Sequence, residues 1–217
     1  MINKKWLLEP EAKKLCNDYG IITGKWRVIK EKEEIDNVLK EINFPIVMKI
    51  VSYDVLHKSD IGGVILNIKN KEEVINSYDR IISIARERKI RLEGVLIEEM
   101  APQGIEVIVG AKRDEQFGPV VMFGLGGIFV EVFNDISLRI VPIDKNEALE
   151  MISEIKAYPI LKGIRGREGC DIDSLADLIL KVSKIMMDIS NIKEIDLNPV
   201  IAYKQGYRVV DARIILS

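Results

Sequence analysis

FPIVMKIVSYDVLHKSDIGGVIL, residues 44–66, is the stretch from which the rest of the chain can be interpreted. Ile46 to Val51 is an apolar, β-branched run that is too short for a helix, so it predicts a buried strand. Lys49 interrupts this run and, by the two-residue period of a strand, shares a face with Val47 and Val51. A buried ammonium group is costly unless an anion lies beside it. We therefore expect an anionic partner at Lys49.

A polar connector follows this strand and ends at Gly62 and Gly63, before a second predicted strand, Val64 to Ile68. Paired glycines let the chain bend and let a phosphate approach backbone N–H groups. The connector contains His57, the single histidine of the sequence, beside Lys58. A lone histidine can be an ordinary surface or capping residue. A glycine-hinged loop that carries a cation also suits a reactive imidazole.

This segment resembles the start of the ATP-grasp domain in the β subunit of ADP-forming acyl-CoA synthetases (acetate–CoA ligase, ADP-forming). The resemblance rests on a lysine at the position of Lys49 and on the phrase LHKSDxGG, here Leu56 to Gly63. The later stretches FGPVVMFGLGGIFVEV, EIDLNPV and VVDARI are also similar to this family, so the matches run from Glu11 to Ile214. The departures are small, such as Tyr53 where a proline is common.

Composition narrows the possible functions. A chain of 217 residues buries about 70–75% of its unfolded surface, enough for one sizeable domain or two lobes. A net charge of −2 offers no field for nucleic acid or an anionic membrane. No signal-peptide core and no apolar run long enough for a bilayer span is found, so we expect a cytoplasmic protein. The two cysteines, Cys16 and Cys170, are expected to be reduced thiols.

Helical and strand patterns alternate as far as Pro102, and a mostly β stretch covers Val120 to Val141. We expect an N-terminal lobe, residues 1–97, that includes a docking helix near residues 10–19, and a C-terminal lobe, residues 98–217. No flexible linker separates them, which predicts two lobes with a cleft between them. The resemblance implies an α+β, ATP-grasp fold with the nucleotide in that cleft.

The C-terminal hairpin predicts a metal site by its register. If its turn is centred on Lys204 and Gln205, residues whose numbers sum to about 409 face each other, so Asn198 lies opposite Asp211. Asp196 points to the same side of the strand. Such oxygen ligands suit Mg²⁺, although Asp211 could instead pair with an arginine such as Arg213 or Arg208. The resemblance implies Mg²⁺ binding by Asn198 and Asp211, and also by Asp196.

The resemblance further implies how the nucleotide, ATP or ADP, is held. Glu98, Glu99 and Met100 are expected near adenine, and Glu106 near the sugar and phosphates, although Glu106 could equally be an exposed strand residue. Neither G-x-G-x-x-G nor G-x-x-x-x-G-K-[ST] is found. Phosphate is therefore expected to be bound by Lys49, Lys58, Gly62, Gly63 and Mg²⁺.

The expected activity is phosphoryl transfer between a phosphorylated His57 and ADP, which makes ATP from acyl-CoA, ADP and phosphate. A neutral imidazole is a competent nucleophile near pH 7. The resemblance implies a separate CoA-binding α subunit in a hetero-oligomer, expected as α2β2, with no nucleic acid or membrane partner. Two alternatives stay open: an ATP-grasp carboxylate ligase without phosphohistidine, and a non-catalytic nucleotide sensor or assembly subunit.

Overall fold

The computed structural model describes residues 5–127, 134–164, 166 and 168–217. The chain divides into two compact units. One contains the N-terminal segment up to Thr23 together with Gln103–Ser217, and the other is Gly24–Pro102. Among the described residues, no helix is both long and apolar enough to cross a membrane.

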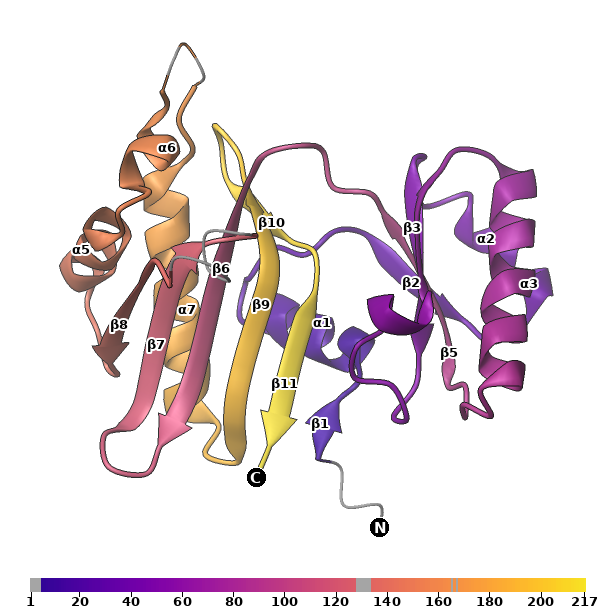
Figure 1. The fold of residues 1–217 in the computed structure, drawn as a ribbon, viewed down its shortest axis with the longest axis horizontal. Helices are drawn as coiled ribbons and strands as arrows, with labels where there is room; N and C mark the ends of the chain where they lie inside the picture. Colours follow the sequence, from indigo (N-terminus) through magenta and orange to yellow (C-terminus); the bar gives the residue numbers. More distant parts are fainter. Residues whose placement is uncertain (1–4, 128–133, 165, 167) are drawn as a thin grey trace. The chain divides into compact units, whose positions relative to one another are not determined.

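The Gly24–Pro102 unit is a four-stranded sheet covered on one face by a long helix (Figure 1). Its strands lie in the order β2–β5–β3–β4, and all neighbours are antiparallel. Helix α3 packs against β3 and β4 through an apolar stripe that includes Val74 and Ile81. The element bounds are β2 Trp26–Ile29, η1 Lys32–Glu34, α2 Ile35–Val38, β3 Ile46–Val51, η2 Ser59–Ile61, β4 Val64–Ile68, α3 Lys71–Glu87 and β5 Gly94–Glu99.

The other unit is built on a seven-stranded sheet in the order β1–β11–β9–β6–β7–β8, with β10 paired to β9 (Figure 1). Helices α1, α5, α6 and α7 share one core with the sheet. The element bounds are β1 Trp6–Leu7, α1 Glu9–Asp18, β6 Ile105–Asp114, β7 Gly118–Leu125, β8 Ile136–Ile140, α5 Lys145–Glu154, α6 Tyr158–Lys162, α7 Ile172–Asp188, β9 Ile192–Ala202, β10 Tyr207–Val209 and β11 Ala212–Leu216.

Alternation along the strands gives this larger sheet two different faces. On β6, Val107, Val109 and Ala111 belong to the core shared with the helices. Ile108, Gly110 and Lys112 project from the opposite face, because successive side chains of a strand point to opposite sides. The helical face supplies the apolar burial that stabilises the unit. The other face is available for a site.

The division of the chain differs from the expected one at residues 97 and 98. Strand β5 continues through Glu99, so that boundary falls inside a strand. The N-terminal segment, up to Thr23, belongs to the same unit as Gln103–Ser217 and not to the unit of the residues that follow it in sequence. Trp6 and Leu7 pair with β11, and Ala12 and Cys16 of α1 lie in the core of the larger unit.

Two other expectations differ or lie outside the description. Ile35, Val38, Leu39 and Ile42 recur at the spacing of an amphipathic helix, but only Ile35–Val38 forms one, the single-turn helix α2, and Ile42 follows in a bend. Part of the expected β stretch, residues 128–133, lies outside the described residues, as do Arg165 and Arg167, whose charges and flanking glycines indicate a basic loop.

Candidate functional site

Lys49 and Glu98 form a buried ion pair inside the Gly24–Pro102 unit. Strand β3 pairs with β5 so that Val47 lies opposite Glu98 and Lys49 lies opposite Leu96. Lys49 and Glu98 are therefore diagonal neighbours on one face, and their charged groups lie 2.6 Å apart. The anion expected beside Lys49 is thus present within the chain. The expected adenine contact, Glu98, has its carboxylate engaged by Lys49.

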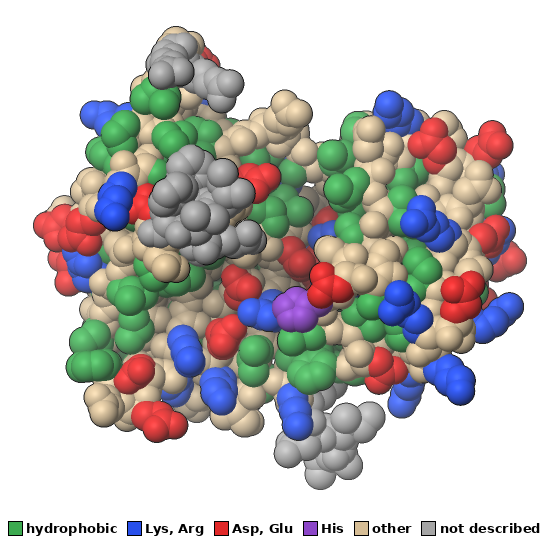
Figure 2. Space-filling model, viewed as in Figure 1, with side chains coloured by type: hydrophobic (Ala, Val, Ile, Leu, Met, Phe, Trp, Pro, Cys, Tyr) green, Lys and Arg blue, Asp and Glu red, His purple; other side chains and the backbone are tan. Residues whose placement is uncertain are grey.

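His57 lies on the segment that joins β3 to β4, residues 52–63. The segment is anchored at its start, where the Ser52 hydroxyl donates to the carbonyl of Arg91 and the N–H of Arg91 donates to the Asp54 carboxylate. The imidazole itself is exposed, and Figure 2 shows the histidine at the surface in purple. The ring is therefore not held by packing against other side chains. The expected phosphoryl transfer through His57 requires such an accessible ring.

Gly62 and Gly63 close this segment through backbone hydrogen bonds. The N–H of Gly62 donates to the carbonyl of Ser59 at 3.0 Å, and the N–H of Gly63 donates to that of Lys58 at 2.8 Å. Gly62 adopts φ 72°, a left-handed conformation that favours glycine. In this conformation neither N–H is available to a phosphate, contrary to the expectation. The glycines instead set the path of the chain back into β4.

The expected adenine segment continues β5 and is held by the loop before β3. The Glu99 carboxylate accepts hydrogen bonds from the backbone and side-chain amides of Asn43, at 3.2 and 2.9 Å. The N–H of Met100 donates to the carbonyl of Pro45 at 2.9 Å. These contacts fix the backbone after β5. The carboxylate of Glu99 and the N–H of Met100 have partners within the unit.

Asn198 and Asp211 face each other in the larger unit, as the register predicts. Val209 lies opposite Val200, and Ala212 lies opposite Leu197. Between these pairs, the N–H of Asn198 donates to the carbonyl of Asp211 at 3.3 Å. The register sum of 409 is thus confirmed on both sides of the predicted metal pair. Asn198 lies on β9 and Asp211 in the link between β10 and β11, and their side-chain oxygens are of the kind that Mg²⁺ prefers.

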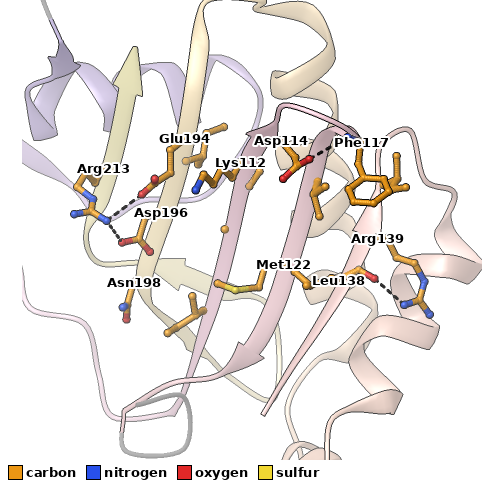
Figure 3. Close-up of a pocket in the computed structure, with 16 residues that line it drawn as sticks. Lys112, Asp114, Phe117, Met122, Leu138, Arg139, Glu194, Asp196, Asn198 and Arg213 are labelled. Atoms are coloured by element: carbon orange, nitrogen blue, oxygen red, sulfur yellow. Dashed lines mark hydrogen bonds and ion pairs between the residues drawn. The ribbon is translucent and has the colours of Figure 1, made fainter. Parts of the chain in front are cut away.

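Asp196 has a different environment from that pair, because it accepts a hydrogen bond from Arg213 at 3.1 Å. The same guanidinium nitrogen donates to Glu194 at 3.2 Å, and Figure 3 shows the three side chains together. Burial raises the pKa of Asp196, against the lowering effect of Arg213. A carboxylate already bound to a guanidinium is a poor metal ligand, so the predicted metal role of Asp196 is not supported. Among the described residues, no three His, Cys, Asp or Glu side chains are grouped to hold a metal.

Arg213 and Glu194 were not predicted as site residues, although the sequence contained the signal. The register sum of 409 places Arg213 opposite Asp196, and the strand period places Glu194 on the same face. The arginine considered as a partner of Asp211 therefore binds two other carboxylates.

Glu106 lies at the start of β6 with an exposed side chain. Its carbonyl accepts the N–H of Gly126 at 2.7 Å, and a Cβ at Gly126 would lie 3.0 Å from that of Glu106. Gly126 therefore lets the chain after β7 pass close to the start of β6. Glu106, Asn198 and Asp211 belong to the larger unit, whereas Lys49, His57 and the Glu98–Met100 segment belong to the smaller one.

An α+β chain with a buried strand lysine in one unit and an Asn–Asp pair in the other has the features expected of a nucleotide-binding ligase. The ATP-grasp domain model matches residues 2–216, so the chain belongs to the ATP-grasp family.

Its relatives include a ligase β subunit of similar length and a much longer ligase chain. The chain is 52% identical over 212 residues to the Pyrococcus furiosus acetate–CoA ligase [ADP-forming] I subunit beta, covering 97% of this chain and 91% of that one. It is 47% identical to the Archaeoglobus fulgidus acetate–CoA ligase [ADP-forming] I, covering 92% of this chain but 29% of that one.

A solved structure extends the likeness to the whole fold. It is the acetyl-coenzyme A synthetase 1 of Ca. Korarchaeum cryptofilum in complex with coenzyme A and Mg-AMPPCP, with its phosphohistidine segment pointing towards the nucleotide binding site. The TM-score is 0.87 at 48% identity, and the match covers 98% of this chain and 93% of that one.

Proposed function

We propose that this chain is the nucleotide-binding subunit of an ADP-forming acyl-CoA ligase. It exchanges a phosphoryl group between His57 and ADP, so that ATP is made reversibly from acyl-CoA, ADP and phosphate. The support is the identity over almost the full length of a relative named as a β subunit, together with the related structure that has a phosphohistidine segment.

The exposure of His57 on a segment anchored at both ends is the observation that carries the proposal. In the direction of enzyme labelling, a neutral imidazole nitrogen attacks the γ-phosphorus of ATP. A phosphorus–nitrogen bond forms while the bond from that phosphorus to the ADP oxygen breaks. In the reverse direction the terminal oxygen of ADP takes the group back, and ATP leaves.

The other residues bind and orient the nucleotide. Lys49 is proposed to contact phosphate oxygens while Glu98 keeps its side chain in place, and Lys58 adds a second cation next to His57. Glu98 to Met100 are proposed to line the adenine site and Glu106 the sugar.

Asn198 and Asp211 would hold Mg²⁺, because a backbone hydrogen bond places these two residues, which carry oxygen ligands, opposite each other. When bound, the ion offsets the negative charge of the nucleotide phosphates.

We further propose that the enzyme is an α2β2 hetero-oligomer that acts in the cytoplasm. The name of the P. furiosus relative supports a partner subunit. Light scattering of the complex purified with its CoA-binding subunit tests the stoichiometry, and a mass other than that of two copies of each chain would rule out α2β2.

The test uses this chain alone with Mg²⁺ and ATP labelled at the γ-phosphate. We expect a covalent label that is stable in alkali and labile in acid, as a phosphohistidine is. His57→Ala should remove the label and leave the Kd for Mg-ADP within about threefold, since an exposed ring contributes little to the fold. Ser59→Ala is the matched control: it removes a neighbouring nucleophile from the same segment and should keep the label.

Other results separate the alternatives. Normal CoA-dependent turnover of the His57→Ala enzyme, assembled with its partner subunit, would favour a carboxylate ligase without phosphohistidine. Mg-ADP binding with neither label nor turnover would favour a nucleotide sensor or an assembly subunit.

A further inference from the structure

Strand β8 turns its apolar side chains outward. Ile136, Leu138 and Ile140 are 37%, 52% and 55% exposed, whereas Ser137 between them is only 6% exposed. A strand that lies over a core normally shows the opposite alternation, with apolar residues inside and polar residues outside. The described part of the chain leaves this apolar face of β8 open to solvent.

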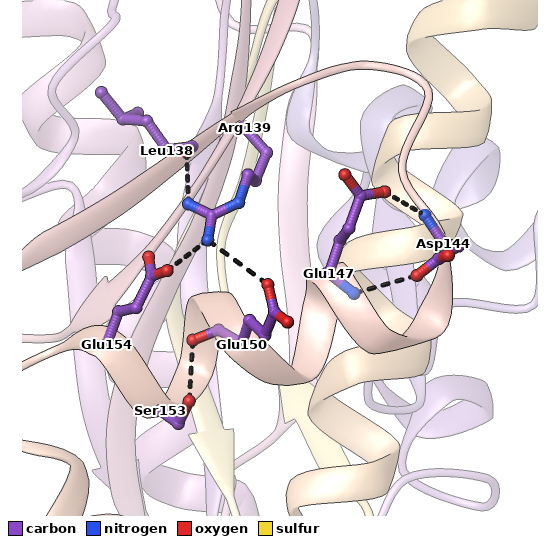
Figure 4. A network of polar contacts seen from close by, with 7 residues as sticks. All are labelled: Leu138, Arg139, Asp144, Glu147, Glu150, Ser153 and Glu154. Carbon is purple, nitrogen blue, oxygen red and sulfur yellow. Dashed lines mark hydrogen bonds and ion pairs between the residues drawn. The ribbon is translucent and has the colours of Figure 1, made fainter.

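The outward orientation is fixed by contacts on the other side of β8. Arg139 forms ion pairs with Glu154 and Glu150 of α5, as Figure 4 shows. A capping box between Asp144 and Glu147 fixes the first turn of the same helix. A one-residue slip that buried the apolar residues would break the Arg139 ion pairs. The exposed face is therefore a stable feature of the fold.

Leu138 and Ile140 border a groove of about 780 Å³ on the sheet face opposite the helices. Leu138 lies opposite Met122 and Ile140 lies opposite Val120, so β7 continues the apolar surface. Phe117, the residue before β7, is 62% exposed and lines the same groove, as Figure 3 shows. We call these residues the β8 patch: Phe117, Val120, Met122, Ile136, Leu138 and Ile140.

Such a surface needs a partner. A contiguous group of exposed apolar side chains on a monomer usually marks an interaction site. Among the described strands, β8 pairs only with β7, so it forms one edge of the sheet, and an apolar edge strand promotes association unless something covers it.

The lengths of two relatives indicate which kind of chain covers the apolar face of β8. The matched region is 91% of the P. furiosus β subunit but only 29% of the A. fulgidus single-chain ligase. The remaining part of the single-chain ligase is joined covalently to its ATP-grasp domain. A two-chain enzyme has to hold the corresponding part through a non-covalent surface.

We propose that the β8 patch is the docking surface for the separate subunit that corresponds to that remaining part. The identity of this partner rests on the proposed function. The position of the patch favours it over a second copy of this chain. The groove runs from the β8 patch to Asn198 on the same face, so a subunit docked there lies beside the proposed metal pair.

The test measures binding of the partner subunit, taken as the chain of the same organism that matches the uncovered part of the A. fulgidus ligase. The double variant Leu138→Lys/Ile140→Lys places two charges on the patch and should raise the Kd at least about tenfold. Leu66→Lys/Met187→Lys is the matched control, because these residues are 61% and 53% exposed on β4 and α7. The control should change the Kd less than about threefold.

Three further measurements make the result decisive. Both double variants should keep the unfolding midpoint and the Kd for Mg-ADP, so that weaker docking is not misfolding. Hydrogen exchange of β7 and β8 in the unsubstituted chain should slow when the partner is added. Light scattering of the chain alone should give a monomer mass.

An unchanged Kd in the patch variant, or no slowing of exchange in β8, would overturn the proposal. So would a dimer of this chain alone that the patch variant dissociates, which would make a second copy the occupant. A third result is also possible: the partner subunit binds through the β8 patch, but His57 is never labelled by ATP. That result would refute the proposed function and support the docking surface.

Discussion

The ammonium nitrogen of Lys49 lies 2.6 Å from a carboxylate oxygen of Glu98, with only 4% of each side chain exposed. Two opposite charges on neighbouring strands are thus withdrawn from water together. In such a pair the desolvation cost of each ion is offset by its partner, so the loss of one partner leaves a buried charge uncompensated.

Glu98→Ala should therefore lower the free energy of unfolding by about 3–5 kcal/mol, measured by urea denaturation. Asp79→Ala, which breaks the exposed Lys32–Asp79 pair, is the control and should cost about 0–1 kcal/mol. The double variant Lys49→Met/Glu98→Leu should recover most of the loss, because both charges are removed. A Glu98→Ala loss below about 1 kcal/mol would show that the pair does not stabilise the fold.

The register between β9 and β11 gives a prediction about metal binding. Asp211→Ala should weaken Mg-ADP binding at least about tenfold, since it removes a carboxylate ligand, and should leave binding of metal-free ADP nearly unchanged. Asp196→Asn should change Mg-ADP binding less than about threefold, because Arg213 already holds that carboxylate. Isothermal titration with and without Mg²⁺ measures both. Equal losses in the two variants would return Asp196 to the metal site.

Gly63 should not tolerate a side chain. A Cβ there would lie 2.6 Å from Cγ2 of Ile50 and 3.0 Å from the carbonyl oxygen of Lys58. Gly63→Ala should cost about 1–3 kcal/mol of stability and reduce labelling of His57, because the end of its segment has to move. Gly206→Ala is the control at a turn: its Cβ meets nothing within 4 Å, and only its φ of 72° opposes the substitution. Labelling should persist in that control.

Cys16 should be unreactive in the folded protein. Burial raises the pKa of its thiol from an ordinary value of 9.0 to about 12, and burial also raises the pKa of Cys170 to about 11. At pH 8 only about one Cys16 thiol in 10,000 is then ionised. Titration with a disulfide reagent should be slow for both thiols in native protein and fast in urea. Rapid native modification of Cys16 would contradict this burial.

The raised pKa of the Cys16 thiol makes the free energy of unfolding depend on pH in the alkaline range. A raised pKa in the folded state means that the contribution of the thiol is complete below pH 9 and is lost as the pH rises towards 12. Denaturation at a series of pH values should show a fall in this window that is smaller for Cys16→Ala than for the unsubstituted chain.

Local patterns in the sequence predicted much of the fold. The run around Lys49 forms β3 with the expected bounds, Ile46–Val51, and the hairpin register sum of 409 is confirmed by Tyr207 opposite Ala202 and Ile214 opposite Ile195. The D-x-x-E pattern of Asp144 and Glu147 is typical of a capping box, which the structure forms at the start of α5. In each case the signal lies within a few residues of the feature that it predicts.

Features that depend on distant pairing were not predicted. Nothing near Trp6 indicates that it pairs with Ile215, and nothing near Lys49 identifies Glu98 rather than a ligand as its anion. The N–H groups of Gly62 and Gly63 were expected to be free for a phosphate. They instead donate hydrogen bonds to carbonyls of the η2 turn. The partner of each of these groups is determined by tertiary contacts, which the local sequence does not specify.

The pairing of β1 with β11 has a consequence for synthesis on the ribosome. One edge of the larger sheet pairs the first described strand, β1, with the last, β11, so that edge cannot form until β11 has been synthesised. The smaller unit is uninterrupted in sequence, Gly24–Pro102, and can complete itself while later codons are still being read. Until β11 is synthesised, the N-terminal segment of the nascent chain, including the apolar face of α1, has no strand to pair with.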